Sequence, residues 1–381
     1  MAVSSISSDI ASTTGIRSEF SAEQAEPGGV SHLPLENEGN MKGTSVDLGR
    51  LMLLAKHTSC VLMGLAAAFG GGLAYATPPA TAPAAGTELI LLGTQGGPPP
   101  SPTRSQPSDL LMVNGRGYLI DVGDGTLRQL SKAGVPYRSI DHIFITHNHD
   151  DHNAGLGPLL GVAWTMGKVA PTEVIGPRGT AKLVSGLIEA FSANEDIRMA
   201  EMGKFYKGGL EDLVHVKEIA AGSRIYEDEN VKVDAIQNCH FHFPADSKLS
   251  SKDLSFAYRF TTAQKTIVIS GDTGPCPQLV DFARGADILV HEVISVKLME
   301  PLLRSVSGGS EERLQGILRH MQEDHSTPEE VGKLAAKANV GMVVLTHLGP
   351  GNPEDPDEAY SAGVRKFYKG KVVVGRDLMR F

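Results

Sequence analysis

The stretch THNHDDHNAGL, Thr146 to Leu156, holds three histidines and two aspartates within six consecutive positions. It directly follows the apolar run Ile143-Phe144-Ile145, which is typical of a buried strand. Imidazole and carboxylate groups crowded in this way would be desolvated or would repel one another, unless a positive charge lies between them. The stretch therefore predicts a metal site at the end of a strand.

The spacing of this motif, HxHxDH, suits metal binding. His147 and His149 are two residues apart, so they project to the same side of an extended segment. The following turn brings Asp151 and His152 toward the same point. Because zinc in catalytic sites is held by His and Asp side chains and keeps a position for water, these four residues are candidate zinc ligands.

One loop cannot complete two metal sites, so further ligands are expected in loops at the ends of other strands. Each candidate segment follows an apolar run or precedes a helix start, and each contains or adjoins Gly, Pro or small polar residues that permit tight loops. These segments are NCHFHF with His240 and His242, ISGDTGP with Asp272, EDHSTPEE with His325, and LTHLGP with His347. His240 and His242 remain alternatives because both would face the same side of an extended segment.

From Glu88 onward, short apolar runs alternate with helical stretches. Strands are predicted at 88–94, 110–113, 118–123, 140–145, 173–175, 214–219, 231–236, 254–260, 266–270, 288–290, 342–345 and 372–374. Helices are predicted near 127–133, after 153, and at 180–191, 277–284, 311–321, 328–338 and 357–367, with Gly115-Arg116-Gly117 as a hairpin turn. This alternation predicts an α/β fold, with layers of helix outside layers of sheet, in one catalytic domain over 88–381.

The N-terminal part has a different character. Residues 1–40 have the composition of a disordered extension, or of an upstream start, and 41–76 resemble an export signal that ends at Ala74-Tyr75-Ala76. Residues 77–87 form a Pro/Ala linker. We therefore expect a periplasmic or secreted protein without stable membrane insertion. An uncleaved membrane anchor is the alternative.

Composition narrows the partners. The net charge of −9 does not supply the broad basic face with which proteins grip nucleic acid, so a small-molecule substrate is favoured over a polynucleotide. The three cysteines lack CxxC spacing, which predicts neither a disulfide framework nor a structural zinc knuckle. Cys239 and Cys276 are interpreted as small buried residues.

HNHDDH, followed by GDTG, a late HST and a TH-L near the end, resembles the metallo-β-lactamase superfamily, in its ribonuclease Z and arylsulfatase-like branch. The similarity runs from LLGTQGG through LIDVGDGT and FAYRF to VVVGRDLM. The resemblance implies an αββα sandwich, a dinuclear metal site and a homodimer. By motif position it implies that His147, His149 and His240 hold one metal, that Asp151, His152 and His347 hold the other, and that Asp272 bridges them.

The resemblance also implies roles next to the metals. His325 would assist proton transfer, Asp151 would belong to the catalytic centre as well as to a metal, and Asp121 would support the site from behind its ligands. Two departures concern the substrate: GLGPLL replaces the family's GLPGLL, and a long Gly-rich arm for transfer RNA has no counterpart between Trp164 and Val231.

The expected function is a di-zinc hydrolase, with Mn²⁺ or Fe²⁺ as alternative metals. A hydroxide held between the metals would attack a phosphodiester or a related ester. Sulfate esters, as for an arylsulfatase, and lactones or carboxylic esters remain alternative substrates, because fold and centre do not fix the substrate. The alternative outside enzymes is a secreted metal-binding protein with an inactive hydrolase fold.

Overall fold

The computed structural model describes residues 86–244, 246–249 and 254–381. The predicted extension, the export signal and nearly all of the linker lie outside the described residues. The first strand begins at Thr87, next to the predicted domain start. Across the described ranges, every helix is too short or too polar to cross a membrane.

The N-terminal half of the domain forms a mixed sheet of six strands, whose spatial order follows the chain. The first three strands pair antiparallel, and the third to sixth pair parallel. The strands are β1 (Thr87–Gly93), β2 (Ser108–Val113), β3 (Arg116–Ile120), β4 (Ile140–Phe144), β5 (Thr172–Gly176) and β6 (Val214–Glu218). Its helices are α1 (Thr126–Ala133), α2 (Leu156–Thr165) and α3 (Thr180–Met202).

The C-terminal half forms a second mixed sheet, in the order β13-β12-β11-β10-β9-β8-β7. Its strands are β7 (Gly222–Glu227), β8 (Lys232–Gln237), β9 (Phe256–Thr261), β10 (Thr266–Ile269), β11 (Ile288–Ile294), β12 (Met342–Gly349) and β13 (Lys371–Val374). Strands β10 to β13 run parallel, whereas β7 to β10 are antiparallel. Its helices are α4 (Pro277–Phe282), α5 (Val296–Val306), α6 (Glu311–Asp324), α7 (Pro328–Ala338) and α8 (Asp357–Phe367).

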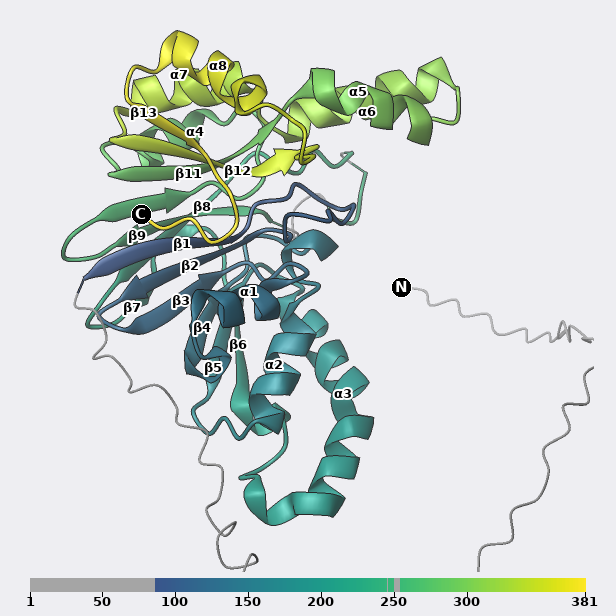
Figure 1. Cartoon of the computed structure of the whole chain (residues 1–381), viewed down its shortest axis with the longest axis vertical. Coiled ribbons are helices and arrows are strands. Elements are labelled where there is room, and N and C mark those ends of the chain that lie inside the picture. The colour runs from purple at the N-terminus through teal and green to yellow at the C-terminus, as the bar shows by residue number, and fades with distance from the viewer. Residues whose placement is uncertain (1–85, 245, 250–253) are drawn as a thin grey trace, which may run out of the picture. The chain divides into compact units, whose positions relative to one another are not determined.

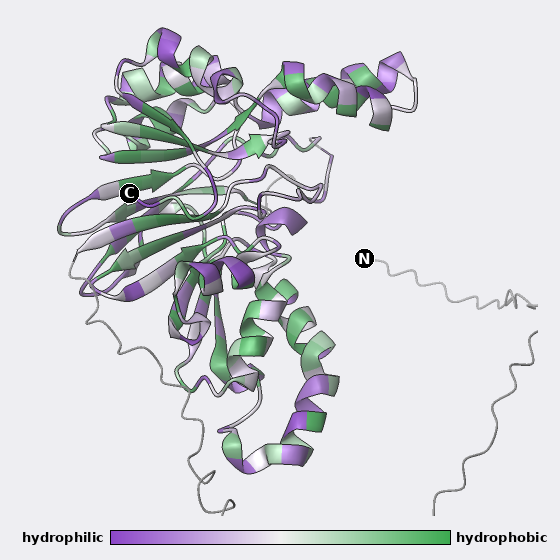
Figure 2. Cartoon of the chain, viewed as in Figure 1, coloured by the Kyte–Doolittle hydropathy of each residue, from purple (hydrophilic) through white to green (hydrophobic). Residues whose placement is uncertain are grey.

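The two sheets pack face to face with helices on their outer faces (Figure 1). Apolar side chains of both sheets interdigitate between them: Phe144 of β4 meets Phe260 of β9 edge to face, with ring centroids 5.2 Å apart. The outer faces are covered by α1 to α3 on one side and by α4, α7 and α8 on the other. The central strands are largely hydrophobic, whereas the helices carry both hydrophobic and hydrophilic residues (Figure 2). The predicted αββα sandwich is confirmed.

Three local features differ from the sequence-based expectation. Strand β7 was not predicted; its sequence GSRIYE has only the adjacent apolar residues Ile225 and Tyr226, so it lacks an apolar alternation, and Arg224 lies at φ 58°. Helix α5 was not predicted either, since Pro301 lies inside it. The hairpin turn consists of Asn114 and Gly115, both at positive φ, while Arg116 and Gly117 already belong to β3.

Helices α5 and α6 form a hairpin that projects from the sheet of β11 and β12 (Figure 1). Their contact has a small apolar core of its own, built from Ile294, Met299, Leu303 and Leu314. Helix α6 ends at Asp324, so His325 lies at the end of the hairpin, three residues before α7 begins at Pro328. Glu330 accepts hydrogen bonds from the Thr327 amide and hydroxyl at the start of α7, in agreement with the predicted helix start.

Candidate metal centre

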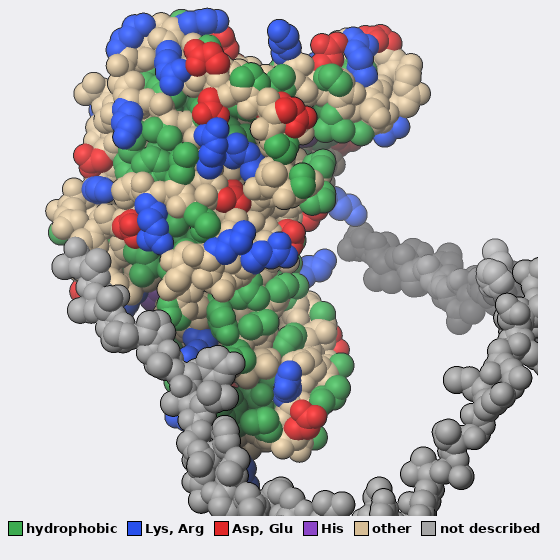
Figure 3. Space-filling view, viewed as in Figure 1, with side chains coloured by type: hydrophobic (Ala, Val, Ile, Leu, Met, Phe, Trp, Pro, Cys, Tyr) green, Lys and Arg blue, Asp and Glu red, His purple; other side chains and the backbone are tan. Residues whose placement is uncertain are grey.

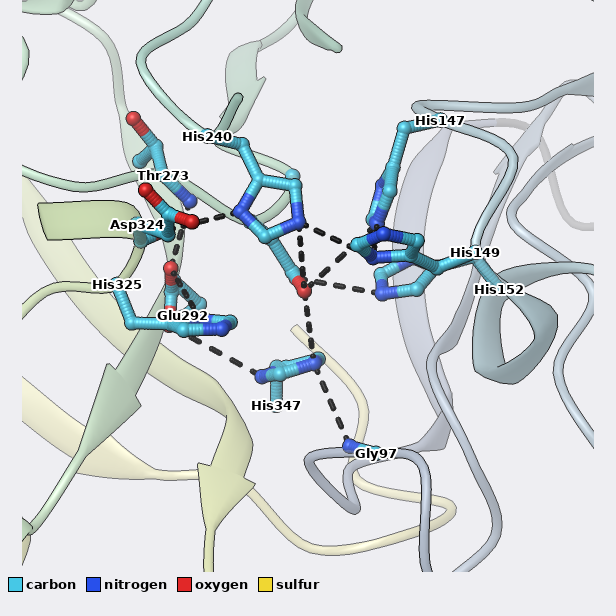
Figure 4. A network of polar contacts seen from close by, with 12 residues as sticks. Gly97, His147, His149, His152, His240, Thr273, Glu292, Asp324, His325 and His347 are labelled. Atoms are coloured by element: carbon cyan, nitrogen blue, oxygen red, sulfur yellow. Dashed lines mark hydrogen bonds and ion pairs between the residues drawn. The ribbon is translucent and has the colours of Figure 1, made fainter. Parts of the chain in front are cut away.

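The candidate ligands come from both sheets and meet at one edge of the sandwich (Figure 4). The HxHxDH motif follows β4, His240 follows β8, Asp272 follows β10, and His347 lies within β12. Because the parallel strands β4, β10 and β12 point their carboxyl ends toward this edge, segments far apart in the sequence converge there.

Three histidines form the first group. The His149 Nδ1 atom lies 3.1 Å from His147 Nε2 and 3.2 Å from His240 Nε2. Ligand nitrogens about 2.05 Å from a tetrahedral zinc ion are about 3.3 Å apart, so the spacing fits one ion. Figure 4 shows the rings turned toward a common point.

Two acidic residues and two histidines form the second group. The Asp151 carboxylate lies 3.5 Å from His152 Nε2 and 3.4 Å from His347 Nε2. Asp272 approaches the same two rings, at 3.3 Å and 3.0 Å. All four side chains are buried, and their ligand atoms lie within 4.8 Å of one another.

Asp272 belongs to both groups. Its Oδ2 atom lies 3.9 Å from His147 Nε2 and 4.0 Å from His240 Nε2, in addition to its contact with His347. The Oδ1 atom and His152 Nε2 are buried and lie 3.3 Å apart, yet neither makes a hydrogen bond of regular geometry with any described residue. Buried polar atoms without partners are costly, so this donor set fits a second cation. The two clusters are consistent with a binuclear metal site.

His240, and not His242, lies in this cluster. His240 is 1% exposed, and its Nδ1 atom is 2.9 Å from the Asp324 carbonyl oxygen, which leaves Nε2 directed at the other histidines. The His242 side chain is 48% exposed and pairs with the Asp324 carboxylate. The irregular chain after β8 therefore turns the two side chains apart, whereas an extended segment would have kept them on the same side.

The buried Asp121 contacts the ring nitrogen of His152 that faces away from the cluster. Asp121 Oδ2 lies 2.8 Å from His152 Nδ1 and accepts a hydrogen bond from the Thr146 hydroxyl, while Oδ1 accepts the Thr146 amide. This contact fixes which ring nitrogen of His152 faces the cluster. The support that the resemblance implied for Asp121 is thus present in the structure.

Burial sets the protonation of the first group. It lowers the pKa of His240 to about 4 and lowers the pKa of His147 well below its usual value. Burial alone would raise the pKa of Asp151, but the neighbouring His152 and His347 lower it to about 2. Neutral imidazoles and ionised carboxylates are the forms that bind metal.

The second group attracts positive charge. Burial opposes charging of His347, yet Asp272 and Asp151 raise its pKa to about 10. The pKa of His152 is raised well above its ordinary value by Asp272, Asp151 and Asp121, against the same opposing effect of burial. A divalent cation would replace protons at these two rings, so metal binding here releases protons.

Glu292 is a site residue that the motif search missed. Both of its carboxylate oxygens lie within about 3 Å of His325 Nδ1, at 3.1 Å and 3.0 Å, and the Thr273 amide donates to Oε1. Burial opposes charging of His325, but Glu292 raises the His325 pKa above its usual value. The sequence did contain a signal for Glu292: this glutamate lies in the apolar run ILVHEVI, a strand in which its side chain must be buried.

Cys239 and Cys276 form a disulfide, which corrects the expectation of two separate buried thiols. Their Cα atoms are 5.3 Å apart, and the bond joins the chain directly before His240 to the start of α4, four residues beyond Asp272. The Gly274 amide also donates to the Cys239 carbonyl oxygen. The pairing was missed because a separation of 37 residues carries no local signal.

Comparisons with known proteins agree with this fold. A family model described as "Beta-lactamase superfamily domain" matches residues 116–348. Ribonuclease Z of Mycobacterium marinum is 30% identical over 296 residues, which cover 77% of this chain and 97% of that protein. Ribonuclease Z of Mycolicibacterium paratuberculosis is 31% identical over 296 residues, with the same coverage.

Two solved structures share the fold. The short form of human tRNase Z aligns with a TM-score of 0.54 at 23% identity, covering 77% of this chain and 98% of that one. Zinc-bound PqqB from Methylobacterium extorquens aligns with a TM-score of 0.51 at 16% identity, covering 77% and 99%. The chain belongs to the metallo-β-lactamase superfamily and is ribonuclease Z-like within it.

Gly97 provides a test of the second group. A Cβ atom at this position would lie 1.8 Å from Asp151 Oδ2, so Gly97→Ala must displace that carboxylate. We expect zinc affinity, measured by competition with a chromophoric chelator, to fall by about tenfold or more. Gly186→Ala in α3 is the control, because nothing lies within 4 Å of its added methyl group. Unchanged zinc affinity in Gly97→Ala would show that Asp151 is not a ligand.

The disulfide provides a test of the loop anchoring. Replacing both cysteines, Cys239→Ser with Cys276→Ser, should lower the free energy of unfolding by about 3–4 kcal/mol, because the bond closes a loop of 37 residues. Guanidinium denaturation of both proteins measures the difference. With dithiothreitol present the two curves should coincide. Equal stability without reductant would contradict the bond.

Proposed function

We propose that the protein is a di-zinc hydrolase that cleaves a small phosphodiester. The single observation that carries the proposal is the pair of buried His/Asp clusters that share Asp272, with the His325–Glu292 pair beside them. His147, His149 and His240 would hold one ion, and Asp151, His152 and His347 the other. The identity to ribonuclease Z supports a phosphodiester as the bond that is cleaved.

Two zinc ions, when bound, supply an acidified water and neutralise negative charge on the ester. The side chains of the protein position the two clusters and their ligands. Asp272 keeps the two clusters in a fixed relation, and Asp121 holds the His152 ring in one orientation. The second group is fully buried, and its low exposure to water strengthens electrostatic interactions there, whereas His149 of the first group is exposed.

His325 is placed to give a proton to the leaving oxygen. Its ring stacks with that of His347, with centroids 5.7 Å apart, while Glu292 holds Nδ1. Nε2 is therefore the ring nitrogen left for the substrate. Because Glu292 raises the pKa of His325, the ring stays protonated at a higher pH than an isolated histidine would.

A small ester outside the cytoplasm fits the chain better than transfer RNA. Among the described residues on the face in Figure 3, Lys and Arg side chains are interspersed with Asp and Glu. The disulfide supports an oxidising compartment, as the sequence between residues 41 and 76 predicted. We propose that the protein is exported and that its substrate is a small diester.

A rate assay tests the reaction class. The zinc-loaded full chain should cleave bis-p-nitrophenyl phosphate faster than p-nitrophenyl sulfate, because a diester suits two adjacent cations. His147→Ala, which removes one ligand of the first group, should abolish turnover and is the blank. A higher rate on the sulfate would replace the proposal with a sulfatase. Turnover of neither would redirect the assays to lactones and carboxylic esters.

The role of His325 can be tested through leaving groups and pH. His325→Ala should keep its zinc, yet lose about 10²–10⁴-fold in rate on diesters with poorly leaving alcohols and much less with p-nitrophenolate. The protonated ring is the active form, so the rate falls as pH rises through its pKa. Glu292→Gln should move that alkaline limb to lower pH, because the raised pKa is lost. Normal turnover of poor leaving groups by His325→Ala would refute the acid role.

A further inference from the structure

Two phenylalanine rings lie beside the metal centre without belonging to the apolar cores. Phe241 and Phe243 flank His242 in the irregular segment after β8, and both are partly exposed. Neither packs against any of the hydrophobic clusters of the described residues. Large apolar side chains normally gain stability by entering such a core, so their position requires another explanation.

The geometry of the rings is ordered. Phe241 and Phe243 stack, with centroids 5.0 Å apart and planes inclined by 28°. Phe241 contacts the first group of candidate ligands: its centroid lies 5.3 Å from that of His149 and 4.9 Å from that of His240. The two rings therefore extend from the candidate metal site outward as a short aromatic platform.

The outer ring of this platform, Phe243, is partly exposed. Within the described residues, Phe241 provides the only ring contact of Phe243, so the second face of Phe243 has no aromatic partner. Aromatic side chains bind planar groups by offset stacking or edge-to-face contact. Because Phe241 contacts the His149 and His240 rings, a substituent of an ester held at the metal centre can reach this platform.

We propose that Phe241 and Phe243 form a subsite for a planar aromatic group of the substrate, next to the scissile ester. This inference deepens the proposed function and rests on it for the position of the ester. It narrows the substrate class to anionic esters that carry an aryl group or a nucleobase. Phe243 is the residue that determines this preference, since Phe241 also supports the histidines.

Binding of product-like anions separates the platform from catalysis. Phenylphosphonate and methylphosphonate carry the same anionic group and differ in the planar ring. We expect the zinc-loaded full chain to bind phenylphosphonate about tenfold more tightly in calorimetry, and Phe243→Ala to reduce this ratio to about twofold or less. Phe243→Tyr keeps a ring and should keep the ratio.

Two controls distinguish the subsite from a structural role. Phe205→Ala removes a ring that is 54% exposed elsewhere on the surface, and the ratio should stay unchanged. The zinc content of Phe243→Ala should equal that of the parent protein. If the rings only shield the histidines, both phosphonates lose affinity equally and the ratio does not move, which would overturn the proposal.

A second pair of ligands distinguishes a nucleobase from an aryl group as the aromatic part of the substrate. Thymidine 5′-monophosphate and ribose 5-phosphate differ in the presence of a base. If Phe243→Ala changes the ratio of the two affinities in this pair, the substrate carries a nucleobase. If Phe243→Ala changes only the ratio for the phosphonates, the substrate is an aryl ester. Because binding is measured without turnover, inactivity on diesters with an intact phosphonate preference would refute only the proposed reaction. Equal or undetectable binding of both phosphonates would refute the subsite.

Discussion

The carboxylate of Asp272 is the point around which the structure is organised. Four imidazole nitrogens, from His147, His152, His240 and His347, lie 3.0–4.0 Å from its oxygens in a buried space. Buried groups of this kind are unfavourable without compensation, and the repulsion between rings adds to the cost. A pair of cations would satisfy the whole set at once, so the loops at this edge of the sandwich present an arrangement of donor atoms suited to that charge.

The surrounding contacts hold those loops in place. Asp121 fixes the loop after β4 through Thr146 and His152, and Glu292 in β11 fixes His325. The Cys239–Cys276 bond joins the segments that carry His240 and Asp272. Each contact links a ligand to a different part of the core, which keeps the donor atoms in position before a metal arrives. The geometry of the metal centre therefore depends on residues from both sheets.

The metal centre and the residues next to it determine different properties: the reaction and the choice of substrate. The two His/Asp clusters define a hydrolytic chemistry that many esters could undergo, because an activated water attacks phosphorus, sulfur and carbonyl carbon alike. Selection among them depends on the groups next to the metals. The aromatic platform of Phe241 and Phe243 is such a group, and it lies on an irregular segment, where substitutions change specificity without disturbing the sheets.

The sequence by itself determined the motif, the alternation of strands and helices, and through them the αββα sandwich. These features are local: apolar runs make strands, and ligands crowd where the strands end. Helix α5 and strand β7 were missed because Pro301 and the exposed positions of β7 break the local pattern. The resemblance already favoured His240 over His242, and the tertiary structure supplied the physical reason. Only the tertiary structure paired Cys239 with Cys276 and brought Glu292 to His325. Those choices depend on which segments meet in space, and contacts between residues 33 or 37 positions apart leave no periodicity in the chain.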